Sequence, residues 1–186
     1  MAALDNANPT ILSASQLPTR HCKPSPRRGP DTIYSHVIWG RNVQDDSTYA
    51  PEPIDEQEIY DLVSPISDPE HPVSLGQLSV VNLDDIHLDP PPAKHSLNSN
   101  AIVQVVVDIT PTITHCSLAT VIGLGVRARL EQCLPPNYRV DVRCKANSHT
   151  QDEQVNKQLA DKERVAAALE NDSLRAVLDK MLETCV

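Results

Sequence analysis

The strand-like run AIVQVVVDIT, residues 101–110, is the feature that most constrains the fold. Alternation puts one set of side chains on one face (Val103, Val105, Val107 and Ile109) and another set on the other (Ile102, Gln104, Val106 and Asp108). Thr110 and Pro111 end the run, because proline cannot donate to a ladder. The segment Ser117–Leu134 then suits a largely buried helix that the two following prolines stop. A strand followed directly by a buried helix favours a sheet covered by helices.

The remaining segments show alternating helical and strand patterns. The segment EQEIYDLV from residue 56 predicts a helix that ends near Pro65. Two short strands are predicted, one for LGQLSVVNL (75–83) and one for YRVDVRCK (138–145). Two further helices are predicted over residues 155–170 and 173–185. The polar, Pro-rich stretch at about 84–100 predicts a long loop between strands. The order predicts a small α+β domain over residues 51–186, with a sheet of three or four strands, helices packed on one face and a C-terminal helical extension.

Residues 1–50 differ in composition from the rest of the chain. They are rich in Pro, Ser, Asn and Arg and lack sustained periodicity, which predicts a disordered N-terminal tail. The cluster of Arg20, Lys23, Arg27 and Arg28 is expected to be solvated, with a weak localisation signal as the alternative. No positive segment leads into an apolar one, so export is not expected.

Composition excludes several classes of function. The chain has 186 residues, a net charge of -9 and a pI near 5.1, which argues against a dedicated nucleic-acid binder. The longest apolar run, LATVIGLGV, has only about half of the roughly 18 residues that a membrane span requires. The five cysteines are odd in number and widely spaced, without CxxC pairs, which favours reduced thiols over disulfides or a self-contained zinc site.

Cys116 stands where the strand gives way to the helix. Unpaired N–H groups and the positive end of the helix dipole stabilise a thiolate there, so the position predicts a lowered thiol pKa. A small buried apolar residue is the equally weighted alternative. His115, His71 or His36 could act as a base, but no spacing selects one. Asp68 and Glu70 in SDPEHP suit an acid–base pair or metal ligands, although a capped, exposed bend is the commoner structure.

Three ordered segments resemble the MIP18-like family, the small subunit of the cytosolic iron-sulfur assembly targeting complex. They are SDPEHP, TPTITHCSLATVIGL (110–124) and VNKQLADKERVAAALEN (155–171), and the resemblance extends over roughly residues 55–182. The last segment, with ANP at 7–9, most resembles the general-purpose, B-type paralogue. Thr114 replaces the family's usual proline, Pro65 interrupts the first helix, and the loop at 84–100 is longer than usual.

The resemblance implies a non-catalytic adaptor. It implies a WD-repeat propeller and a HEAT-repeat protein as partners, delivery of iron-sulfur clusters to cytosolic and nuclear apoproteins, a cytoplasmic and nuclear location, and a link to chromosome segregation. It also implies that Cys116 is the reactive thiol, supported by His115, Asp68, Glu70, Thr110 and Thr112. No stably bound cofactor is expected. A transient iron-sulfur cluster on Cys116 would be shared between two copies or with a partner, since clusters usually take four protein ligands.

Two alternatives remain at the level of the sequence. The helix-terminal thiol of Cys116 is compatible with a cysteine-dependent enzyme. A stand-alone carrier of metal or clusters is the other. The adaptor is the leading hypothesis, because three motifs in order support it.

Overall fold

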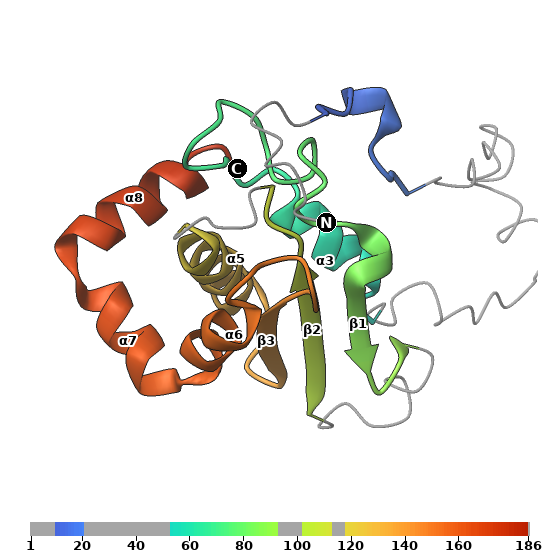
Figure 1. The fold of residues 1–186 in the computed structure, drawn as a ribbon. Helices are drawn as coiled ribbons and strands as arrows, with labels where there is room; N and C mark the ends of the chain where they lie inside the picture. Colours follow the sequence, from blue (N-terminus) through green and yellow to red (C-terminus); the bar gives the residue numbers. More distant parts are fainter. Residues whose placement is uncertain (1–9, 21–52, 93–101, 113–117, 186) are drawn as a thin grey trace, which may run out of the picture.

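The computed structural model describes residues 10–20, 53–92, 102–112 and 118–185. The named elements are η1 (Ala14–Gln16), α3 (Glu56–Val63), η3 (Leu83–Asp85), β1 (Ile86–Asp89), β2 (Val103–Ile109), α5 (Ala119–Cys133), β3 (Tyr138–Cys144), α6 (Asp152–Ala160), α7 (Lys162–Glu170) and α8 (Asp172–Leu182). Figure 1 shows the strands side by side, with the helices ranged around them. The predicted α+β class is confirmed.

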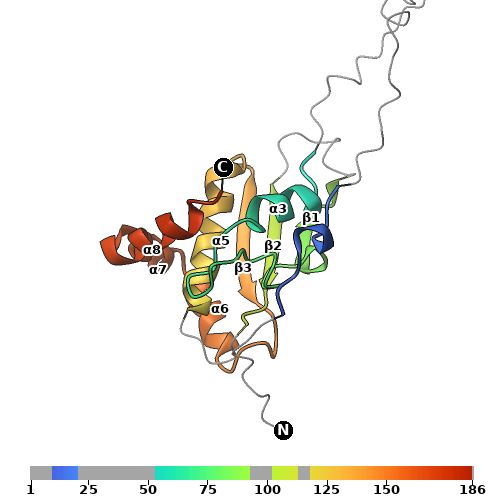
Figure 2. The same ribbon diagram turned by 90° about the horizontal axis from the view of Figure 1, so that it is seen from above.

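The sheet has the order β1-β2-β3, with β1 antiparallel and β3 parallel to β2. Val107 pairs with both Ile86 and Val142, so apolar side chains meet in a layer across all three strands. Along β2, Val103, Val105, Val107 and Ile109 are buried, as the alternation predicts, while the residues between them are half-buried. One face of the sheet therefore forms the core (Figure 2).

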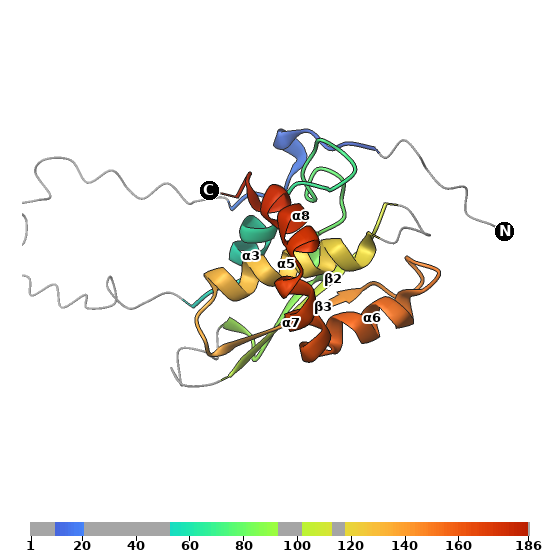
Figure 3. The same ribbon diagram turned by 90° about the vertical axis from the view of Figure 1, so that its left-hand side faces the viewer.

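Helix α5 lies between the sheet and α8, and connects the parallel strands β2 and β3 (Figures 1 and 3). Helices α6 and α8 can approach α5 closely because α5 carries two glycines. A Cβ on Gly123 would lie 2.6 Å from Leu159 Cδ1 of α6, and one on Gly125 would lie 3.1 Å from Met181 Cε of α8. Both positions therefore leave no room for a larger side chain, and Pro135 follows directly after the C-cap of α5.

Helix α6 runs beside the outer strand of the sheet. The Asn156 side chain accepts a hydrogen bond from Cys144 N (2.7 Å) and donates one to Cys144 O (3.2 Å). This amide thus replaces a neighbouring strand at the end of β3. Cys144 itself is buried.

The prediction of a strand over residues 75–83 is wrong. Residues 74–80 form a buried turn with local backbone bonds, including Leu78 N to Ser74 O (3.1 Å) and Ser79 N to Gly76 O (3.1 Å). Gly76 fits tightly here, because a Cβ would lie 2.8 Å from Ser64 Cβ. The first strand is β1 instead, inside the segment 84–100 that was predicted as a loop. Its alternation of buried and exposed residues was visible in Ile-His-Leu-Asp.

The single helix predicted over residues 155–170 is two helices, α6 and α7. They are separated at Asp161, which has an extended backbone and a side chain that accepts from Glu163 N (3.1 Å) and Arg164 N (3.3 Å). A capping aspartate ends one helix and begins the next. Asn171 caps α8 in the same way, since its side chain accepts from Ser173 N and Leu174 N.

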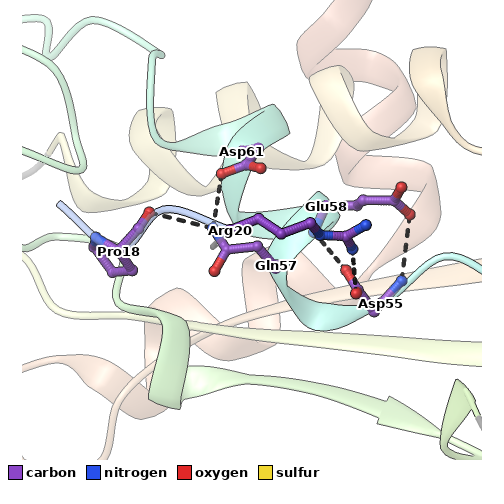
Figure 4. A network of polar contacts seen from close by, with 6 residues as sticks. All are labelled: Pro18, Arg20, Asp55, Gln57, Glu58 and Asp61. Atoms are coloured by element: carbon purple, nitrogen blue, oxygen red, sulfur yellow. Dashed lines mark hydrogen bonds and ion pairs between the residues drawn. The ribbon is translucent and has the colours of Figure 1, made fainter. Parts of the chain in front are cut away.

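Residues 10–20, inside the expected tail, lie against the domain. Leu12 N donates to Gln77 O (2.8 Å), and Gln57 Nε2 of α3 donates to Pro18 O (3.2 Å). Arg20, expected to be solvated, forms an ion pair with Asp55, the N-cap of α3 (Figure 4). This stretch is therefore anchored at both ends.

Candidate functional site

The SDPEHP segment folds into a turn built around one carboxylate. Asp68 Oδ1 accepts hydrogen bonds from Glu70 N (2.8 Å), His71 N (2.9 Å) and His71 Nδ1 (3.1 Å). The Asp68 side chain is 3% exposed, so the expectation of an exposed bend is wrong for this residue. Asp68 positions the turn, because an aspartate followed by two N–H donors closes an Asx turn.

The two other polar residues of the turn differ from Asp68 in exposure. Glu70 is exposed, and the His71 ring is 27% exposed while its Nδ1 is held by Asp68. With Nδ1 donating to Asp68, Nε2 is the ring nitrogen left to accept a proton or a hydrogen bond. The turn therefore presents an oriented imidazole and an accessible carboxylate.

The turn is fixed to the end of α8. Ser67 N donates to Met181 O (3.0 Å), Thr184 Oγ1 donates to Pro65 O (2.7 Å), and the Ser67 and Thr184 hydroxyls lie 3.1 Å apart. These bonds join segments that are more than 110 residues apart in the sequence. They hold the turn and the helix at a set separation.

A groove of about 570 Å³ lies between residues 67–72 and the last two turns of α8. Val177 and Met181 supply apolar lining from α8, and Lys180 and Glu183 supply charges. Val177 is 38% exposed, which is high for an apolar residue. An accessible groove with apolar lining and charged groups suits a segment of another protein better than a small ion.

The residues of α8 that line this groove were not predicted as site residues. The stripe of Leu174, Val177, Leu178, Met181 and Leu182 predicted only an amphipathic helix. Leu178 is buried and does not line the groove, whereas Val177 and the largely buried Met181 do. Sequence alone gave no signal that separates these two roles.

The other predicted site residues fall between β2 and α5 in the sequence. Thr110 N donates to Val80 O (2.8 Å) at the end of β2, and Thr112 is half-buried. Cys116, His115 and Thr114 lie outside the described residues. Helix α5 begins at Ala119 with Leu118 as its N-cap, so Cys116 comes two residues before that cap in the sequence. Its reactivity stays a prediction.

A smaller cavity of about 140 Å³ lies beside the first turns of α5. It is lined by residues of α5, α6 and α7: Thr120, Leu124, Gln158, Arg164, Val165 and Ala168. Thr120 Oγ1 donates to Gln158 Oε1 (3.1 Å) across it. Within the described part of the chain, no three His, Cys, Asp or Glu side chains come together as a metal site.

Comparison with known proteins identifies the family. No family model matches the sequence. The chain is 47% identical over 189 residues to MIP18 family protein C144.16 of Schizosaccharomyces pombe, which covers 100% of the chain and 99% of that protein. The chain belongs to the MIP18 family.

Other relatives of this MIP18 family member match a large part of the chain. It is 61% identical over 135 residues to MIP18 family protein YHR122W of Saccharomyces cerevisiae, which is 73% of the chain but only 56% of that relative's length. It is 45% identical over 132 residues to the mouse protein named cytosolic iron-sulfur assembly component 2B, covering 71% of the chain and 75% of the mouse protein. The resemblance based on the three motifs is thus confirmed.

Proposed function

We propose that this chain is a non-catalytic adaptor of cytosolic iron-sulfur protein assembly, which helps deliver clusters to cytosolic and nuclear apoproteins. The observation that carries the proposal is its 45% identity to a mouse protein named as a component of that assembly. Its proposed partners are a WD-repeat propeller, a HEAT-repeat protein and the apoproteins themselves. The proposed location is the cytoplasm, and also the nucleus.

The groove between residues 67–72 and α8 supports a role in binding proteins. Its lining joins apolar side chains to charged ones, the combination found at the margins of protein interfaces. Among the described residues, no helix is both long and apolar enough to pass through a membrane. The net charge of -9 disfavours direct contact with nucleic acid.

Cys116 is the proposed reactive thiol, with His115, Asp68, Glu70, Thr110 and Thr112 in support. The proposal for Asp68 is indirect, since its carboxylate is buried and already accepts three hydrogen bonds. Any iron-sulfur cluster on Cys116 would be cargo held briefly and shared with a second copy or a partner, because one thiolate supplies one of the usual four ligands.

Affinity capture tests the adaptor directly. The full chain should recover a WD-repeat propeller and a HEAT-repeat protein from a cell extract, and loss of both would contradict the proposal. Val177→Asp puts a charge in the groove and should weaken recovery of at least one partner. Arg175→Asp is the matched control, because Arg175 is exposed on α8 but does not line the groove.

Two further assays separate the adaptor from the alternatives. Turnover of an acyl or disulfide substrate by the purified protein, abolished in Cys116→Ser, would favour an enzyme. Iron that stays bound to the purified protein after anaerobic reconstitution, together with the visible absorption of a cluster, would favour a stand-alone carrier. The adaptor proposal predicts no turnover and no stably bound cluster for the protein alone.

A further inference from the structure

Residues 10–20 form a strap that lies on the surface of the domain and is drawn in blue in Figures 1 and 2. Leu12, Leu17 and Pro18 of the strap are half-buried, and its other residues are exposed. The apolar side chain of Ile11 is among the exposed ones, at 55%. Within these described residues, none belongs to the hydrophobic core. The strap therefore rests on the domain as a bound peptide would, and the core does not depend on it.

Two of the contacts that hold the strap use its backbone. Leu12 N donates to Gln77 O (2.8 Å), and Pro18 O accepts from Gln57 Nε2 of α3 (3.2 Å). The Gln57 amide is oriented for this contact by a second bond, which it donates to Asp61 Oδ1 (2.8 Å). Backbone N–H and C=O groups are present along any chain, so these two bonds do not require the side chains of the strap. Another extended segment can make the same bonds.

The specific contact comes from Arg20, which is the one charged residue of the strap. Arg20 pairs with Asp55 Oδ2, while Asp55 Oδ1 accepts from Glu58 N (2.9 Å) and caps α3 (Figure 4). The two paired side chains are 43% and 36% exposed, so water can replace either one. Asp55, Glu56, Glu58 and Asp61 give α3 and its cap a negative charge, and the helix contains no Lys or Arg. This face of α3 therefore attracts a basic segment.

We propose that this face of α3, together with Gln77 O, is a docking site for an extended, arginine-containing segment of a partner protein, and that the strap occupies the site until this segment displaces it. The partner's arginine takes Asp55 Oδ2, and its backbone pairs with Gln57 and Gln77. Charge complementarity favours such a segment over an acidic or purely apolar one. The residues of this site do not line the groove beside α8, and the proposal does not depend on the adaptor function.

A peptide with the sequence of the strap, TILSASQLPTR, tests the site in the full chain. The peptide carries fluorescein, and its binding is measured by fluorescence anisotropy at about 0.15 M salt. Arg20→Glu in the protein repels the strap from Asp55 and opens the face. We expect the peptide to bind this variant about tenfold more tightly than wild type, because the tethered strap of wild type competes at a high effective concentration.

A change in the peptide keeps the protein itself constant. The same peptide with Arg20→Glu should bind the opened protein about tenfold more weakly than the original peptide, since a carboxylate then faces Asp55. Equal affinity of the two peptides would show that no basic side chain is recognised, and would overturn the proposal.

Two variants made in the opened protein locate the bound peptide. Asp55→Asn keeps the helix cap, because asparagine caps as well as aspartate, but it removes the charge and should weaken binding about fivefold. Glu56→Gln is the matched control. It removes a carboxylate from the same turn of α3, and within the described residues Glu56 makes no hydrogen bond or ion pair with the strap, so binding should change less than about twofold.

Three results would overturn the proposal. The first is equal affinity of wild type and the Arg20→Glu protein for the peptide. The second is binding that is unchanged by Asp55→Asn. The third is a dimer of the wild-type chain, detected by sedimentation velocity, that Arg20→Glu dissociates, because this result would assign the face to a second copy rather than to a partner.

Discussion

Asp68→Ala should destabilise the domain strongly, because it removes the acceptor around which the 67–72 turn is built. Three donors converge on Asp68 Oδ1 at 2.8 to 3.1 Å, and the side chain is 3% exposed. A hydrogen bond to a charged group contributes about 1.5 to 3 kcal/mol, but bonds that share one oxygen are not additive. We therefore expect a loss of about 2 to 4 kcal/mol in the free energy of unfolding.

Asp68→Asn separates the role of the charge from that of the acceptor. An asparagine oxygen can accept from the same donors without charge, so this variant should lose only about 1 kcal/mol. Asp179→Asn is the matched control, because it removes one negative charge from the exposed face of α8 and should change stability by less than about 0.5 kcal/mol.

Urea unfolding of the three variants measures these differences. The order of midpoints should be control, then Asp68→Asn, then Asp68→Ala, with similar slopes. Hydrogen exchange should also become faster at the amides of Glu70 and His71 in Asp68→Ala. An alanine variant within about 0.5 kcal/mol of wild type would refute the view that the buried carboxylate maintains the turn.

Three other perturbations test the packing around the sheet. Asn156→Ala should cost about 1 to 3 kcal/mol in urea unfolding, since Cys144 N and O lose the amide that pairs with them. Gly123→Ala should cost about 1 to 3 kcal/mol despite better helix propensity, because its Cβ would lie 2.6 Å from Leu159; unchanged thermal stability would contradict this. Backbone N–H donors from Asn147 and Glu153 lower the pKa of the Asp152 carboxyl in the folded protein. The ionised carboxylate therefore stabilises the fold at pH values above its ordinary pKa, and this stabilisation is lost as the pH falls through the lowered pKa of the folded state. The difference between wild type and Asp152→Leu in urea unfolding should therefore be larger at pH 7 than at about pH 3, and equal differences would count against this reading.

The helices and strands that sequence predicted well are those whose pattern is local and long. In β2 the alternation of seven residues matched the observed burial along the whole strand. The helix predicted from residue 56 is α3, which begins at Glu56, and Asp55 caps it by accepting from Glu58 N at 2.9 Å. Such signals depend on neighbours in sequence, which the chain itself specifies.

The errors have a common physical cause. The apolar residues of 75–83 were interpreted as a strand because burial and strand propensity produce similar runs. Leu75, Leu78 and Val80 are buried in a turn because other segments surround them, including Ile66, whose carbonyl accepts from Leu75 N at 2.8 Å. Strand β1 has only four residues, so its alternation was too short to predict against the prolines that follow.

The sequence by itself determined the α+β class, the buried face of β2, the glycines of α5 and the membership of the MIP18 family, because each is written in local pattern or in ordered motifs. Tertiary structure alone decided that Asp68 is a buried anchor and that Val177 lines a groove. These facts depend on contacts such as Ser67 with Met181, which join residues distant in the chain. Only folding brings such residues together, so no local pattern could specify them.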